Sequence, residues 1–506
     1  MLKSIKILFV ALTALCAVSC LDKVPQSAIP QQQAMQTFDD AEQTVTGIYS
    51  LLKSSALYSG YLTILPDLQT DLVYAVDGYS NTYGNFWLWT VRSTTSEIES
   101  VYASLYQIIA NCNFYLDYVP RVAVATTDES KLTDLNTYTG EVYAIRALAY
   151  SELLKCYCKA YKPETAQTEL GVVLRTTTLD KQPLPRASLY DSYQQVIKDL
   201  ERAEELLDED NDAHSSAFVT RAMALALHAR VALYMEDWQS AIEYSTELIE
   251  SRNFALSSAV SYYTSNMTYF DYMWNYDVGT EIIWRIGFTT TSYGGALGQS
   301  FLGFNVDYTY YYPDYVPAQW VLGLYSDRDM RYSSYFYTLP TGYNHGLQWP
   351  LLVKYFGNQD FINNALIYHT VMPKPFRLAE QYLIRAEALC RQQTPNFSAA
   401  SKDINTLRAS RIVSGGGINL TADNYIEQIA AERVRELYME GFRLHDFKRW
   451  GELYRDGEGF TRTPQSNSLV EGSSLSVKAV DPLFVWPIPI HEIEAPGSLV
   501  QPNESN

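Results

Sequence analysis

Apolar residues recur at three- and four-residue intervals along much of this chain, and this periodicity constrains the fold more than any other feature of the sequence. It predicts amphipathic helices over residues 98–118, 140–160, 188–207, 220–235, 238–249, 376–390, 398–410 and 425–439. A further helix is expected to begin near Thr37, because Asp39 and Asp40 would then lie in its first turn, where carboxylates interact favourably with the helix dipole. The chain is therefore predicted to be mainly α.

The helices predicted over 220–235 and 238–249 are joined by a very short turn. Small residues recur along one stripe of the first of them, at Ala222, Ala226, Ala229 and Ala232. Because one helix pair cannot bury its apolar face alone, neighbouring pairs must stack. We expect divergent TPR-like helix pairs that are interrupted by insertions.

Two insertions, 74–95 and 261–349, lack helical periodicity and are rich in aromatic residues. Tyrosine, with 41 copies, is the compositional outlier of the chain, and its ring with a polar tip suits surfaces that hold a half-hydrated ligand. Long irregular segments of a compact protein usually carry its function. We therefore expect the ligand-binding residues in these two insertions.

The aromatic residues of the insertions suit a carbohydrate ligand, since sugar rings stack on the faces of Trp and Tyr while Asn, Asp and Arg bond the hydroxyl groups. On an extended segment, Trp87 and Trp89 would project from one face and form a platform. The opposite wall would come from Trp320 and the tyrosines of 308–315. The predicted ligand-binding residues are Tyr79, Tyr83, Trp87, Trp89, Arg92, Tyr308, Tyr311 and Trp320. The alternative is that these rings close the core beneath long loops.

The beginning of the chain has the layout of a bacterial lipoprotein signal. Lys3 and Lys6 precede the apolar stretch 7–18, which is too short to span a bilayer stably, and small residues lead into Cys20. Residues 1–19 are therefore predicted to be a signal peptide, Cys20 the lipidation site, and the polar, proline-containing segment 20–36 a tether. An ordinary signal peptide with a chance cysteine, or a buried helix, is the alternative.

Charge and cysteine content exclude several classes of protein. The formal net charge of −19 argues against nucleic acid and against electrostatic adhesion to anionic lipid, because both need clustered Lys and Arg. Four cysteines remain beyond the signal, too few for a disulfide scaffold in a chain of this length, and we expect small buried thiols. These four are Cys112, Cys156, Cys158 and Cys390.

The chain lacks the common catalytic motifs G-x-S-x-G, Walker A and H-E-x-x-H, so no catalytic residue is predicted. Asp208, Asp210 and Asp212 alternate as in a calcium loop. Ala213 and Val219, however, stand where an EF-hand would need Gly and Glu. No cofactor or metal is predicted, and a looser structural calcium site stays open. Paired carboxylates for glycoside hydrolysis can lie far apart in a sequence, so a surface hydrolase remains an alternative.

The segment 432–451, ERVRELYMEGFRLHDFKRWG, resembles the signature near the C-terminus of the SusD/RagB family of outer-membrane lipoproteins. Other pieces similar to the family follow in order along the chain: Gly140-Glu141, Arg146-Ala147, 220–235 with Trp238, Asp327-Arg328, 377–388 and the tail WPIPIHEIE. Two departures are Tyr102, where the family has Trp, and the segment after Tyr157, which lacks the usual Gly-x-x-Pro turn. The family uses the charged residues of the signature structurally, so we assign them no chemistry.

The resemblance implies a single mainly α SusD-like domain over 37–506, with minor β structure, an N-terminal part of about 37–210 and a C-terminal part of about 270–506. It also implies a non-catalytic protein that is lipid-anchored to the outer membrane of a Bacteroidetes cell and faces the exterior. Such proteins capture oligosaccharides, or in some relatives peptides, and deliver them to a SusC-like TonB-dependent transporter over which they form a lid. Because binding residues of this family lie in variable insertions, the resemblance assigns none here.

Overall fold

The computed structural model describes residues 34–76, 78, 80–304, 309–342, 348–463 and 474–506. The predicted signal peptide, Cys20 and nearly all of the predicted tether lie outside the described residues. The described part of the chain is mainly α, as predicted. Its helices up to residue 250 are α2 (Phe38–Leu51), α3 (Tyr61–Leu68), α4 (Gly84–Trp87), α5 (Ser96–Ala125), α6 (Glu129–Tyr157), α7 (Leu189–Leu206), α8 (Arg221–Tyr234) and α9 (Trp238–Glu250).

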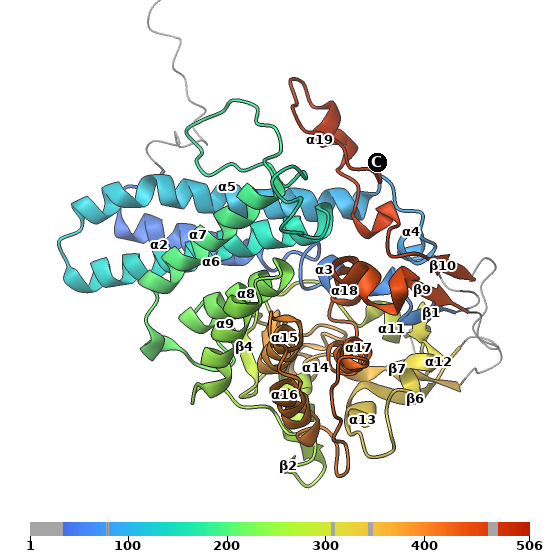
Figure 1. Cartoon of the computed structure of the whole chain (residues 1–506). Helices are drawn as coiled ribbons and strands as arrows, with labels where there is room; N and C mark the ends of the chain where they lie inside the picture. Colours follow the sequence, from blue (N-terminus) through green and yellow to red (C-terminus); the bar gives the residue numbers. More distant parts are fainter. Residues whose placement is uncertain (1–33, 77, 79, 305–308, 343–347, 464–473) are drawn as a thin grey trace, which may run out of the picture.

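The remaining part of the chain adds shorter helices and a second group of long ones (Figure 1). They are α10 (Tyr269–Tyr276), α11 (Gln299–Leu302), α12 (Gln319–Leu322), α13 (Arg331–Tyr335), α14 (Gln359–Ala365), α15 (Leu378–Arg391), α16 (Phe397–Ala409), α17 (Tyr425–Leu437), α18 (Arg443–Trp450) and α19 (Ile490–Glu494). The helices predicted from periodicity are all present, with bounds that shift by a few residues, or by more at the ends of α5 and α6.

Side-chain caps explain where several helices begin. The Thr37 hydroxyl accepts a hydrogen bond from the Asp40 backbone, and the Asp40 carboxylate accepts one from the Thr37 backbone, which forms a capping box at α2. The Ser188 hydroxyl accepts from the Asp191 backbone at the start of α7. Both positions agree with the sequence analysis.

Helix pairs stack as expected of a TPR-like arrangement, and the stack runs in the order of the sequence but passes from α9 directly to α15. Helices α5, α6 and α7 pack side by side, whereas α9 packs between α8 and α15 (Figure 1). Ala229 and Ala232 of the predicted small-residue stripe form a buried cluster with Ala241 of α9 and with Ile384 and Ala388 of α15. The C-terminal part of the chain therefore completes the helix stack that α8 and α9 begin.

Short antiparallel strand pairs form the minor β structure. The pairs are β1 (Val73–Ala75) with β5 (Tyr315–Pro317), β2 (Tyr262–Thr264) with β3 (Met267–Thr268), β4 (Ile282–Trp284) with β8 (Phe376–Arg377), β6 (Phe336–Pro340) with β7 (Gln348–Leu352), and β9 (Phe460–Arg462) with β10 (Leu475–Val477). In the first pair Val73 lies opposite Pro317 and Ala75 opposite Tyr315. This pairing brings the two aromatic insertions together.

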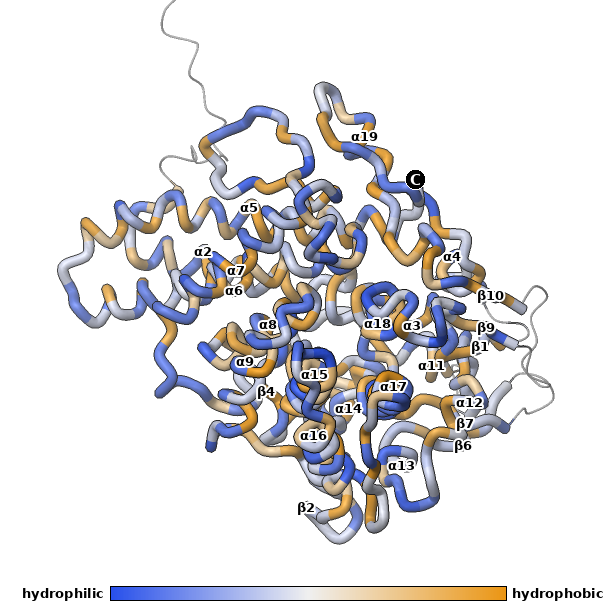
Figure 2. Tube along the Cα trace, in the orientation of Figure 1, coloured by the Kyte–Doolittle hydropathy of each residue, from blue (hydrophilic) through white to orange (hydrophobic). Residues whose placement is uncertain are grey.

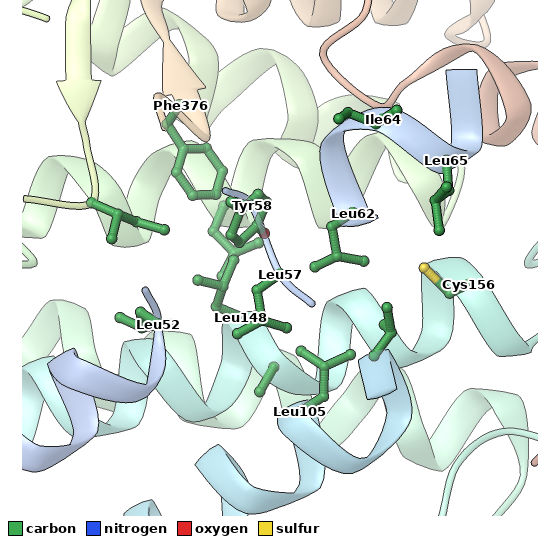
Figure 3. Close-up of a cluster of buried hydrophobic side chains, with 14 of the residues drawn as sticks. Leu52, Leu57, Tyr58, Leu62, Ile64, Leu65, Leu105, Leu148, Cys156 and Phe376 are labelled. Carbon is green, nitrogen blue, oxygen red and sulfur yellow. The ribbon is translucent and has the colours of Figure 1, made fainter. Parts of the chain in front are cut away.

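Apolar faces of the helices and strands meet in a core that includes residues from Met35 to Ile488. Figure 2 shows apolar residues interspersed with polar ones along the helices, and Figure 3 shows part of the core, where Leu57 and Leu62 lie near Leu105 and Leu148. The four cysteines beyond the predicted anchor are free thiols, and all are buried.

Part of the C-terminal tail is packed into the core. Trp486 is fully buried, and its indole nitrogen donates to Gln69 Oε1 over 2.9 Å, so this part of the tail belongs to the core rather than lying on the surface. Helix α19 begins directly after Pro489, because proline is tolerated at a helix start although it breaks a helix interior.

The charged residues of the C-terminal signature are buried in ion pairs. Glu432 lies 2.8 Å from Arg331, and Glu436 lies 2.9 Å from both Arg377 and Arg411. Burial would raise the pKa of Glu432, but Arg331 and neighbouring guanidinium groups outweigh it and lower the pKa to about 2. These residues join α17 to α13, β8 and the end of α16, which is a structural role.

Within the ranges given above, no helix combines the length and the apolar character needed to cross a membrane.

Candidate ligand-binding site

A polar cleft of about 410 Å³ opens where α3, the turn before α4 and the segment around α11 meet. Aromatic side chains on its walls are Tyr61, Tyr83, Phe304 and Tyr312. Hydroxyl and amide groups come from Ser55, Ser80, Thr82, Gln299 and Ser300, and a carboxylate from Asp314. The cleft therefore combines aromatic faces with both hydrogen-bond donors and hydrogen-bond acceptors.

The turn before α4 has an unusual backbone that presents Tyr83 to the cleft. Tyr83 has φ 57° and Asn81 has φ 65°, in the left-handed region that bulky side chains rarely adopt. Gly78, with φ 85°, enters the same turn without this steric cost. Such strained positions persist only where the surroundings hold them, and they cluster at binding sites.

Hydrogen bonds hold this turn against the second aromatic insertion. The Ser80 hydroxyl donates to Asp314 Oδ1 over 2.9 Å, and the Tyr315 hydroxyl donates to the Thr82 carbonyl over 2.6 Å. The Val76 amide also donates to the Asp314 carbonyl over 3.0 Å. These bonds extend the β1–β5 pairing and fix the two insertions as opposite walls of one cleft.

Glycine allows the close approach that forms one wall. A Cβ atom on Gly295 would lie 2.5 Å from the Ser59 carbonyl oxygen, so only glycine fits against the turn that leads into α3. The Gly295 amide donates to Ser59 Oγ over 2.9 Å. This contact brings residues 295–304 next to Tyr61.

Two tyrosines stand against each other beside the cleft. The ring centroids of Tyr61 and Tyr83 are 5.8 Å apart and meet edge to face at 79°. Burial, with a smaller effect of neighbouring acidic groups, raises the pKa of Tyr83 to about 12, so its hydroxyl stays neutral and both donates and accepts. Tyr312 is 38% exposed, which leaves much of its ring open to a ligand.

The described lining of the cleft is poor in carboxylate groups. Canonical glycoside hydrolysis uses two carboxylates on either side of the scissile bond. Among the described residues that line the cleft, Asp314 alone carries a carboxylate, and it already accepts the hydrogen bond of Ser80.

The predicted platform of Trp87 and Trp89 is wrong. The segment forms the short helix α4 instead of an extended strand, and both rings are buried, Trp87 fully and Trp89 to 9% exposure. Trp87 Nε1 donates to the Val73 carbonyl over 3.3 Å, and Trp89 Nε1 donates to Asp481 Oδ1 over 3.2 Å. These two tryptophans close the core beneath the loop, which is the alternative that the sequence left open.

The other predicted residues fall in several places. Tyr83 lines the cleft, whereas Tyr311 is not among the lining residues, although its ring lies 6.2 Å from that of Phe304, which is. Arg92 is exposed and is not among the residues that line the cleft, and Trp320 lines a separate cavity. Tyr79 and Tyr308 lie outside the described residues.

The ligand-binding residues predicted from the sequence do not include Tyr61, Gln299, Tyr312 or Asp314, which line the cleft. Tyr312 lies in the tyrosine-rich segment that the sequence indicated as a wall. Tyr61 follows a short Ser-Gly turn and carries no signal of its own.

Helix pairs stacked beside an irregular part that carries the cleft define the architecture, and comparison with known proteins identifies it. The family model described as starch-binding and associating with the outer membrane matches residues 20–233, and the model of the SusD family matches residues 308–505. The chain belongs to the SusD/RagB family, as its sequence motifs predicted.

Relatives of similar length support the assignment. SusD-like protein P25 of Formosa agariphila is 23% identical over 96% of this chain and 95% of its own length, and SusD-like protein P38 of the same organism is 24% identical over 88% and 91%. A crystal structure of a SusD superfamily protein from Bacteroides thetaiotaomicron superposes with a TM-score of 0.77, at 21% identity over 92% of this chain and 99% of the other. Surface glycan-binding protein A from Bacteroides fluxus superposes with a TM-score of 0.67, at 19% identity over 93% and 100%. At these identities the structures show that the fold is shared.

Proposed function

We propose that this protein captures oligosaccharides in the cleft between Tyr61, Tyr83 and Tyr312, without catalysis and without a cofactor. The observation that carries the proposal is the combination of aromatic rings with many hydroxyl and amide groups in one cleft. Sugar rings offer C–H faces to aromatic rings and hydroxyl groups to polar side chains, so both kinds of wall would be used. The volume of about 410 Å³ also falls in the usual range of small-molecule sites, roughly 300–1,000 Å³.

Names of structural relatives support a carbohydrate ligand. One relative is named a surface glycan-binding protein and another a SusD-like carbohydrate binding protein, from Bacteroides fluxus and Bacteroides vulgatus. The family description of starch binding with outer-membrane association agrees with them. We carry the general class, a glycan, to this chain, and not a particular sugar.

The proposal includes a place in the cell and a partner. Lipid on Cys20 would anchor the protein to the outer surface of the outer membrane, and the segment before α2 would be the flexible tether. There it would act as the lid of a SusC-like TonB-dependent transporter and pass the bound oligosaccharide to it.

Isothermal titration of the mature chain with a panel of neutral oligosaccharides tests the proposal. At least one sugar should bind. Tyr83→Ala and Tyr312→Ala should each lower the affinity for that sugar at least tenfold, because each removes a ring from the cleft wall. Tyr262→Ala is the control, since Tyr262 is 59% exposed on β2 and lies outside the cleft. Silence across the sugars together with binding of oligopeptides would reject the glycan proposal and favour peptide capture.

A further inference from the structure

A second cavity, of about 340 Å³, shares no lining residue with the cleft. It lies among β1, α12 and β9, which are neighbours at the right of Figure 1. Its walls are formed by Asp71 and Tyr74 at β1, by Gln319 and Trp320 of α12, and by residues 461–463 at β9. Trp320, predicted for the glycan site, belongs here.

Arg462 gives this cavity an unusual charge. Its side chain is 3% exposed, and its guanidinium carbon lies 4.2 Å from the centroid of the Trp87 ring, with one donor on the Trp87 carbonyl. In the described part of the chain, no carboxylate lies within ion-pair distance of Arg462, although the charge of Asp71 acts on it, and its buried Nε and Nη1 atoms have no hydrogen-bond partner. A buried charge without a counterion is strongly unfavourable, so an anion in the cavity would be stabilised.

Asp71, the carboxylate of the same cavity, already has cationic partners. Its two oxygens lie 3.1 and 3.2 Å from Arg443, and a further guanidinium, that of Arg455, lies 3.6 Å away. Asp71 is therefore shared among several guanidinium groups, and Arg462 is the cation on the described cavity wall. Burial also lowers the pKa of Arg462 to about 10, which still leaves it charged at neutral pH.

We propose that this cavity binds the carboxylate of an acidic sugar residue, a uronic acid, with Arg462 as the counterion. Trp320 is partly exposed and held in place by its Nε1 bond to the Asp71 carbonyl, 2.7 Å, so its indole offers a surface for the sugar ring. The Tyr74 hydroxyl, buried and without a partner in the described structure, is a further hydrogen-bonding group at this wall. The choice of a sugar over another carboxylate rests on the proposed function.

The functional consequence is a second contact for a glycan that carries both neutral and acidic residues. The cleft would hold neutral residues, and the cavity would select chains with a uronic acid. Selection by charge would also favour such chains against neutral ones of the same size.

Binding of glucuronate and of glucose to the mature chain, measured by ligand-observed NMR, tests the inference. Glucuronate should bind at least tenfold more tightly than glucose, and the preference should weaken as salt is raised. Arg462→Gln should abolish the preference. Because Arg462 packs on the core, its replacement could also affect folding, and a second pair of variants avoids this. Thr463 is exposed at the cavity wall. Thr463→Glu adds a negative charge there, and Thr463→Gln adds a neutral side chain of similar size.

Glucuronate should bind Thr463→Gln at least tenfold more tightly than Thr463→Glu. Equal binding of glucuronate and glucose, or equal binding by the two Thr463 variants, would overturn the inference. So would tri-alanine displacing glucuronate at lower concentration, since it would assign the cavity to a peptide carboxylate. The proposed function is tested separately, by titration with the neutral oligosaccharides and by the Tyr83 and Tyr312 variants.

Discussion

Replacing Trp87 with alanine should destabilise the fold, because Trp87 belongs to the core and not to an exposed platform. Its side chain is fully buried, its indole nitrogen donates to the Val73 carbonyl over 3.3 Å, and its ring meets that of Tyr74 edge to face at 5.9 Å. The Arg462 guanidinium also lies on the ring, 4.2 Å from its centroid. All of these contacts disappear in the variant.

The expected loss follows from these contacts. Truncating a buried Trp or Phe to Ala typically lowers the free energy of unfolding by about 3–5 kcal/mol. We expect the upper part of this range, about 4–5 kcal/mol, because a hydrogen bond and a desolvated cation–π contact are lost as well.

Urea unfolding followed by circular dichroism measures this loss. Tyr262→Ala is the matched control, an aromatic truncation at a 59% exposed position, and should change the free energy of unfolding by no more than about 0.5 kcal/mol. If Trp87→Ala lost less than about 1 kcal/mol, the ring would not be part of a packed core, and the reasoning would be refuted.

Two further predictions concern the buried ion pairs. Glu436→Gln should lower the free energy of unfolding by about 3–5 kcal/mol in urea titrations, because three arginines lose a shared carboxylate; a loss below about 1 kcal/mol would contradict this. Burial tends to raise the pKa of Glu387 and Glu432, but adjacent arginines lower it to about 2, against about 4.3 in an unfolded chain. Their contribution is therefore complete above about pH 4.3 and lost as the pH falls towards 2, so the Tm should drop steeply between these values; a flat profile would contradict it.

Helices of this protein were predictable because their signals are local. Periodicity located the helical segments, and the residues Thr37 and Ser188 marked starts that the capping bonds confirm. Burial of charge was not predictable in the same way, since Glu432 and Glu436 would look alike on a solvated helix face. Their partners come from α13, β8 and the end of α16, which only the tertiary fold brings together.

Part of the cleft could be predicted from the sequence. Composition located two aromatic insertions, and Tyr83 from the first and Tyr312 from the second do line the cleft. The directions of the side chains could not be predicted, because the expectation that Trp87 and Trp89 project from one face assumes an extended chain. Left-handed backbone at Tyr83 leads the chain into α4 instead. The Trp87 ring then packs on β1 and β9, and the Trp89 ring on Phe460 and Phe484.

Positions that depend on contacts between distant segments could not be assigned. Tyr61 lines the cleft because Gly295 packs against the turn before α3. Trp320 lines the other cavity instead, because α12 faces β1 and β9. Neither contact has a local sequence signal.

A crystal structure of the mature chain with the oligosaccharide that binds most tightly tests the central claim most directly. The account predicts a sugar ring within about 4.5 Å of Tyr83 or Tyr312, with its hydroxyl groups bonded to polar side chains of the cleft. Clear density for the ligand elsewhere on the protein, with the cleft empty, would contradict it.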